Sequence, residues 1–318
     1  MRLGSVLVVL ALVASPVHAH DFFISPSAHR VDIGKPVSIV MQVGYDKEMD
    51  VLPRSNRRIV RFEGLLGTTV QAVEGKHGES PAGRIAFDSA GVATIIYQSS
   101  HTDIELDGPK FEHYLVEEGL EDIAAERAKL GVTASPGRES YARYAKTLVT
   151  VGDGTDGWNR RVGLPAELVA LTDPRAGGLA QFQLFYEDKP RANARVDILR
   201  IEKTRLISVS HARTDAGGKV ALQVPGDGVW LVATTLMRAA PPELGLEGDW
   251  ESFWASIEFE TGAAPKKPSK GGCSTGDPGT LGIAFLLLAW LESARRRGRH
   301  DEDSNCTRGD AVLDDRSR

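Results

Sequence analysis

Short apolar runs that alternate with polar residues, and that stop at glycine, proline or asparagine, limit how this chain can fold. Such a pattern of period two predicts strands with one buried face. Many short strands separated by turn residues are typical of a β-sandwich. The candidate strands occupy residues 31–43 (with a turn at 34–36), 58–62, 68–72, 83–86, 92–98, 141–151, 163–171, 178–186, 194–202, 207–213, 219–224, 228–236 and 250–260.

One segment departs from this alternation. In residues 111–130 the apolar side chains recur at helical spacing, and Gly119 falls between two such stretches. This predicts two helices broken at the glycine. We therefore expect a mainly β protein of two immunoglobulin-like β-sandwich domains, over residues 20–152 and 160–261, with a helical insertion around 109–131 in the first.

Two local patterns in the second half support strand structure. Residues 214–219 read Thr-Asp-Ala-Gly-Gly-Lys, a turn sequence that predicts a hairpin between its flanking strands. Trp250, Trp254 and Phe259 alternate along the last candidate strand. Large aromatic side chains in this arrangement favour core packing over a ligand platform.

The first 19 residues have the pattern of a secretory signal peptide. Arg2 supplies a positive charge, an apolar run covers residues 5–14, and small residues Val17 and Ala19 precede the expected cleavage point. The alternative is a retained membrane anchor, but the apolar run falls short of the roughly 20 residues that a spanning helix needs. Cleavage after Ala19 makes His20 the first residue of the exported protein.

The C-terminal region has the pattern of a second targeting signal. A linker with a small-residue motif around Cys273 covers residues 262–278, a short hydrophobic helix with an arginine cluster covers 279–299, and a polar tail covers 300–318. This order resembles the sorting tails of myxobacterial surface proteins, although those end soon after the arginines. The resemblance implies processing or lipid anchoring at Cys273. A plain single-pass anchor is the alternative, for which the apolar stretch is short.

Composition excludes several classes of function. The formal net charge is −5 and the isoelectric point about 5.9, which argues against nucleic acid as a partner. The two cysteines, Cys273 and Cys306, both lie in the C-terminal region, so the predicted sandwiches contain no disulfide, thiolate nucleophile or cysteine zinc site. The sequence has no G-x-S-x-G, H-E-x-x-H, phosphate-binding loop or dinucleotide motif. We therefore do not expect an enzyme.

Five further segments of the chain belong together as a set: residues 20–24, 110–120, 138–146, 214–218 and 249–256. Together they resemble the DUF4198 family of exported bacterial proteins, which is historically linked to nickel and cobalt uptake. The resemblance implies a periplasmic or surface β-sandwich, sometimes found beside transition-metal transporters.

The exported N-terminus is the strongest candidate for chemistry. A terminal His20 offers a free α-amine and an imidazole, and the low pKa of an α-amine lets a metal displace its proton. We expect a nickel, cobalt or copper ion at a site that includes His20, Asp21, His101 and His113. The choice of His101 and His113 among the five further histidines of the predicted domains is open, and His20 is equally consistent with a cleavage site alone.

These observations predict an exported accessory protein for metal uptake or handling, periplasmic or facing the outer surface and anchored or processed at its C-terminus. Its expected partner is a membrane metal transporter or a surface protein. A metal-free adhesion or scaffold protein is the alternative, and an oxidative enzyme with copper at the terminal histidine is a third hypothesis.

Each of two clusters of charged residues can be interpreted either as a functional site or as part of the structure. Arg138, Glu139, Arg143 and Lys146 offer an anion site, but an ion-pair network that holds the helices is favoured. The adjacent pair Glu117 and Glu118 has catalytic potential if buried together. On an amphipathic helix a solvated face is the favoured interpretation.

Overall fold

A computed structural model describes residues 21–45 and 48–262 of the chain. The predicted mainly β fold is confirmed, because three sheets account for most of this part. His20, Ala19 and Cys273, together with both targeting segments, lie outside the described residues.

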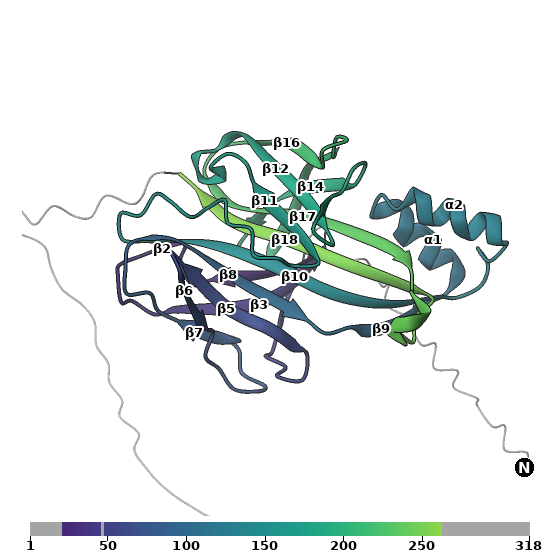
Figure 1. The fold of residues 1–318 in the computed structure, drawn as a ribbon, viewed down its shortest axis with the longest axis horizontal. Coiled ribbons are helices and arrows are strands. Elements are labelled where there is room, and N and C mark those ends of the chain that lie inside the picture. Colours follow the sequence, from purple (N-terminus) through teal and green to yellow (C-terminus); the bar gives the residue numbers. More distant parts are fainter. Residues whose placement is uncertain (1–20, 46–47, 263–318) are drawn as a thin grey trace, which may run out of the picture. The chain divides into compact units, whose positions relative to one another are not determined.

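Three sheets make up the fold (Figure 1). The first has four strands: β1 (Asp21–Pro26), β3 (Val37–Tyr45), β4 (Glu48–Leu52) and β7 (Gly83–Ile85). The central sheet has ten: β2 (Arg30–Val31), β5 (Ile59–Leu66), β6 (Thr69–Ala72), β8 (Gly91–Ser99), β9 (Thr102–Leu106), β10 (Gly137–Val151), β14 (Arg195–Glu202), β15 (Arg205–Arg213), β17 (Gly228–Ala239) and β18 (Trp250–Thr261). The third has four: β11 (Ala166–Ala170), β12 (Gly178–Tyr186), β13 (Lys189–Pro190) and β16 (Lys219–Val224).

The central sheet is buried on both faces, and β10 makes this clear. Successive side chains of a strand point to opposite faces of its sheet. Ala145 and Val149 of β10 join the core beneath the first sheet, whereas Tyr144 and Leu148 join the core beneath the third. The fold is therefore three layers of sheet, with hydrophobic side chains packed on both faces of the middle layer.

The two predicted sandwich domains share this middle layer. β10, from the first predicted domain, pairs in parallel with β18 from the second, over Glu139–Thr147 and Trp250–Glu258. A count of two separate domains is not confirmed, because one sheet contributes to both cores.

The turn at residues 214–219 forms as predicted, with the Asp215 carboxylate accepting the backbone N–H groups of Gly217 and Lys219. The predicted hairpin is wrong. β15 pairs with β14 in the central sheet, whereas β16 pairs with β12 in the third sheet. The turn therefore carries the chain from one layer to another, which local sequence cannot reveal.

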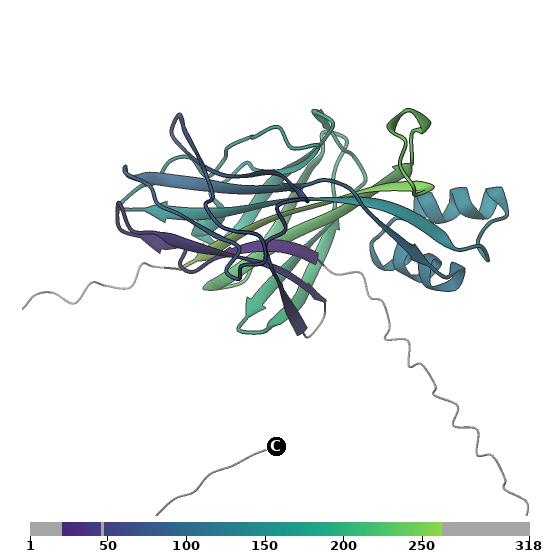
Figure 2. The same cartoon turned by 90° about the horizontal axis from the view of Figure 1, so that it is seen from below.

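The predicted helical insertion is confirmed as α1 (Gly108–Glu117) and α2 (Glu121–Leu130). Both helices lie at one end of the long central strands (Figure 2). Phe111 and Leu115 of α1 pack against Trp250 of β18. Two short 3₁₀ helices, η1 (Pro174–Ala176) and η2 (Pro242–Leu244), lie in connections between strands.

The aromatic residues of β18 behave as the sequence predicts. Trp250 and Phe259 are buried core side chains, and Trp254 packs partly buried beside the helices. Within residues 21–45 and 48–262, no helix has the length and apolar character needed to span a membrane. The predicted hydrophobic segment 279–299 falls outside this range.

Candidate functional site

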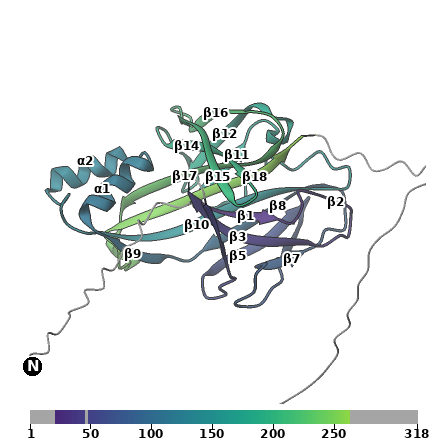
Figure 3. The same cartoon turned by 180° about the vertical axis from the view of Figure 1, so that it is seen from behind.

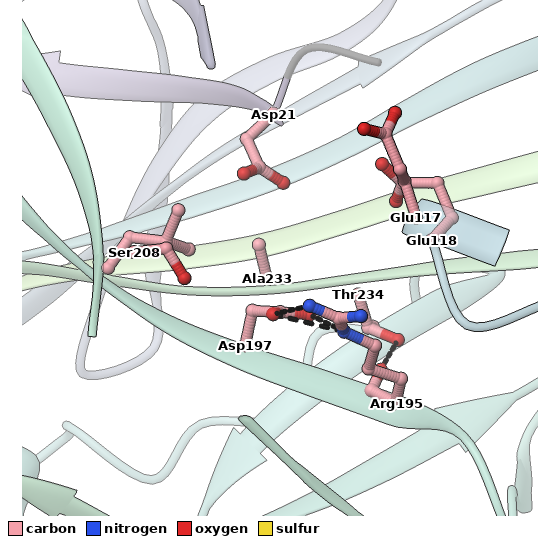
Figure 4. Close-up of a pocket in the computed structure, with 9 residues that line it drawn as sticks. Asp21, Glu117, Glu118, Arg195, Asp197, Ser208, Ala233 and Thr234 are labelled. Atoms are coloured by element: carbon pink, nitrogen blue, oxygen red, sulfur yellow. Dashed lines mark hydrogen bonds and ion pairs between the residues drawn. The ribbon is translucent and has the colours of Figure 1, made fainter. Parts of the chain in front are cut away.

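An acidic pocket opens at the first described residue of the chain. Its volume is about 220 Å³. Carboxylates from three different elements reach it, as Figure 4 shows: Asp21 from β1, Glu117 and Glu118 from the end of α1, and Asp197 from β14. The other lining residues are Arg195, Leu199, Ser208, Ala233 and Thr234.

Alternation along β1 places Asp21 in this pocket. Phe23, two residues on, shares its face of the strand and is fully buried against Leu199 and Leu231 of the central sheet. This contact fixes β1 across the central sheet (Figure 3). Phe22 points to the opposite face and joins the core beneath the first sheet. Asp21 is therefore held over β14 and β17 by the packing of its neighbours.

The end of α1 delivers the two glutamates. Gly119 follows them with a φ of +70°, a left-handed conformation that favours glycine. A Cβ at this position would also lie 2.7 Å from the side chain of Arg195. Gly119 thus permits both the helix end and the close approach of α1 to β14.

Charge in the pocket is only partly neutralised. Arg195 donates to Asp197 through Nη2 and Nε, with distances of 2.7 and 2.9 Å. Glu118 accepts a hydrogen bond of 2.6 Å from the Thr235 hydroxyl. Asp21 and Glu118 therefore share the pocket without an arginine of their own.

The pKa values follow from this imbalance. Burial, and then the negative charges of Glu118 and Asp197, raise the pKa of Asp21 well above its ordinary value, while Arg195 opposes the shift. Burial, supported by the charge of Asp197, raises the pKa of Glu118 to about 7, against the hydrogen bond from Thr235. A bound cation would reverse the penalty that these carboxylates impose on one another.

The structure brings together some of the predicted site residues. Asp21 lines the pocket, and His113 lies at its edge, where Nε2 is 3.1 Å from the Oε1 of the lining residue Glu117. His101 is not among the lining residues; its Nε2 lies 2.9 Å from Glu251, which Arg238 also holds. His20 lies outside the described residues.

Sequence reasoning missed Glu118, Asp197 and Arg195. The solvated face favoured for the glutamate pair does not describe Glu118, which is half-buried and accepts a hydrogen bond from Thr235. The residues Arg195 and Asp197 do carry a signal, because a polar pair two residues apart within an apolar strand marks one polar face.

Across residues 21–45 and 48–262, no three histidine, cysteine, aspartate or glutamate side chains are arranged to coordinate one ion. A metal at this pocket would therefore need further donors, and His20 is the residue bonded directly to Asp21.

The polar block on β10 does not form one ion-pair network. Arg138 pairs with Asp249 at the surface, and Lys146 pairs with Glu167 in the interior. Only Glu139 contacts a helix, by accepting a hydrogen bond of 3.2 Å from the Tyr114 hydroxyl of α1. Ser252 also donates to Glu139, so this buried carboxylate joins α1 to β10 and β18.

Comparison with known proteins gives one family. A family model described as "Domain of unknown function (DUF4198)" matches residues 17–238. No curated protein matches the sequence.

Solved structures give only distant likenesses. The D0-D1 domain of intimin is 14% identical, with a TM-score of 0.20, over 74% of this chain and 96% of its own. The Yersinia pseudotuberculosis adhesin InvE is 12% identical, with a TM-score of 0.18, over 75% of this chain and 58% of its own. Scores this low carry no argument about function.

Proposed function

We propose that this chain, which belongs to the DUF4198 family, is an exported accessory protein that binds a transition-metal ion at its N-terminus. The observation that carries the proposal is the acidic pocket around Asp21, directly beside the residue that cleavage after Ala19 would expose. The ion is cargo for uptake or handling, with nickel, cobalt or copper as the candidates.

The donors of the proposed site complement one another. Consecutive Cα atoms lie about 3.8 Å apart, so the α-amine and imidazole of His20 originate next to the Asp21 carboxylate. Two nitrogen donors and one or two carboxylate oxygens suit Ni(II), Co(II) and Cu(II). Glu118 is the second carboxylate in the proposal, because it shares the pocket with Asp21 and forms no ion pair with another described residue.

The remaining pocket residues would orient and balance these donors. Arg195 forms an ion pair with Asp197, so Asp21 and Glu118 are the carboxylates that we propose for the cation. Glu117 and His113 would stand at the edge of the site as an auxiliary pair. The contact of His101 with Glu251 gives it no part in the proposed site.

The proposed location rests on the two targeting signals expected from the sequence. We assign the protein to the periplasm or the outer surface, anchored or processed near Cys273, with a membrane metal transporter as the expected partner. Tethering at the C-terminus would leave the N-terminal site free to exchange its ion.

The proposal is tested by following thermal unfolding of a protein that begins at His20 while Ni(II), Co(II), Cu(II) or Zn(II) is added. At a metal concentration about 100 times the Kd, binding stabilises by about 2.7 kcal/mol, which corresponds to about 5–10 °C for a protein of this size. We expect this shift to vanish in His20→Ala. The matched control is His211→Ala, an exposed histidine of β15, which should keep the shift. No shift with any of the four metals would contradict metal binding and favour the scaffold alternative.

A further inference from the structure

Arg143 of β10 is a cation without a charge partner. Its guanidinium carbon lies over the ring of Phe22 at 4.7 Å and over the ring of Tyr141 at 5.1 Å. Among the described residues, no carboxylate lies within ion-pair distance of it, and its side chain makes no hydrogen bond to the protein. Ring contacts use none of the five N–H donors of an arginine, so these remain available.

The other two basic residues of β10 each form an ion pair, unlike Arg143. Arg138 makes a two-pronged contact with Asp249, and Lys146 contacts Glu167. A half-buried guanidinium has a high desolvation cost unless something accepts its hydrogen bonds. Arg143 is thus the one basic side chain of β10 for which the described residues provide no acceptor.

A second arginine and two tyrosines surround it. Arg58 donates to the Thr102 hydroxyl, and Thr102 is the register partner of Tyr141 across β9 and β10. Tyr97 of β8 lies with its ring 5.1 Å from that of Phe22. No ion pair to Arg58 is present in the described part of the chain either. The hydroxyl groups of Tyr97 and Tyr141 make no hydrogen bond to these residues.

Electrostatics links these groups. Burial lowers the pKa of Arg143, and the charge of Arg58 lowers it further, while Tyr141 and Tyr97 oppose this. Burial raises the pKa of Tyr97, and Arg143, Arg58 and Arg54 each act in the opposite direction. The groups that act most strongly on these two pKa values include no carboxylate of the described residues. The cluster therefore has a local positive potential in a protein whose net charge is −5.

We propose that Arg58, Tyr97, Tyr141 and Arg143 form a binding site for a small organic carboxylate. The free N–H edge of Arg143 matches the two oxygens of a carboxylate. Tyrosine hydroxyls supply further donors, and the half-buried ring of Tyr141 offers an apolar contact for the body of the ligand. The site is separate from the acidic pocket, because Phe22 and Asp21 point to opposite faces of β1.

The test uses the full exported chain and benzoate, acetate and inorganic phosphate as probes, with binding followed by calorimetry and by thermal unfolding. We expect saturable binding of benzoate, weaker binding of acetate, and a loss of affinity of about tenfold or more in Arg143→Gln. Arg143→Lys keeps the positive charge but loses the paired N–H donors of the guanidinium, so it should also bind benzoate more weakly. Arg138→Gln, on the same strand and paired with Asp249, should bind as the parent does.

A second variant guards against misfolding of Arg143→Gln. Arg58 is exposed, and Arg58→Gln should fold and still reduce benzoate affinity by about threefold or more. Unchanged affinity in both variants, or no saturable binding of either carboxylate, would overturn the proposal. Binding of phosphate alone would overturn its assignment to carboxylates.

Discussion

Replacing Glu118 by glutamine is expected to stabilise the metal-free protein at pH 8 by about 3 kcal/mol, and to have little effect at pH 4. In the folded protein the pKa of Glu118 is about 7, above its ordinary value of 4.5. A raised pKa means that the folded state favours the protonated carboxyl. The stability associated with that proton is present below pH 4.5 and is lost as pH rises through 7. Glutamine is never charged, so it avoids this loss.

The groups that set this effect are known. Asp197, Asp21 and Glu139 disfavour the charged form of Glu118, whereas Arg195 favours it and Thr235 hydrogen-bonds to it. Urea unfolding at pH 4, 6 and 8 measures the difference, with Glu126→Gln on the exposed side of α2 as the control. An equal effect at every pH, or destabilisation at pH 8, would show that burial does not raise this pKa.

The same variant separates structure from function. If Glu118 is a metal ligand, Glu118→Gln should raise the stability of the metal-free protein at pH 8 while it reduces the stabilisation that added metal provides. A residue with a purely structural role would not produce gains and losses of opposite sign. At a functional site, a substitution that removes a destabilising charge is expected to stabilise the protein and at the same time to weaken ligand binding.

The second large effect is expected at the buried pair Lys146 and Glu167. Their side chains are 2% and 0% exposed, and Nζ lies 2.9 Å from Oε1. Glu167 also accepts the backbone N–H groups of residues 162, 163 and 164. Glu167→Ala leaves a buried ammonium with only the carbonyl oxygen of Arg160 at 3.3 Å, so we expect a loss of about 3–5 kcal/mol.

Removing one partner of this pair should cost more stability than removing the other. Lys146→Met is expected to cost less than Glu167→Ala, because three backbone N–H groups still hold the carboxylate. Urea unfolding of both variants at pH 7 measures the order. The exposed pair of Lys110 and Asp107 serves as a control, and Lys110→Ala should cost less than about 1 kcal/mol. Equal losses at the buried and the exposed pair would contradict this account.

Local sequence predicted most of the strands and both helices, because their patterns depend on which face is buried. β12 and β16 match their predicted ranges, and Gly119 separates the helices as expected. The sheet to which each strand belongs could not be predicted in the same way. The turn at residues 214–219 looks like a hairpin, yet its flanking strands pair in different sheets. Pairing between distant strands, such as β10 with β18, leaves no mark in either segment.

The candidate site was predictable only in part, for the same reason. Asp21 stood out because it follows the expected cleavage point. Glu118 did not, because its burial depends on β17, which carries Thr235 and lies far along the chain. His101 and His113 were chosen without knowledge of their surroundings. His101 contacts Glu251 of β18, whereas His113 contacts Glu117 of its own helix. Distance in space, which decides a metal site, comes from the tertiary fold.

Metal binding at the first exported residue is the central claim, and it is tested most directly by calorimetric titration of Ni(II) and Cu(II) into two proteins. Both begin at His20, and the second has its α-amine acetylated. Acetylation turns the basic α-amine into an amide but leaves the imidazole, Asp21 and Glu118 in place. We predict that it weakens metal affinity by about 100-fold or more. Equal affinity in the two proteins would contradict the claim.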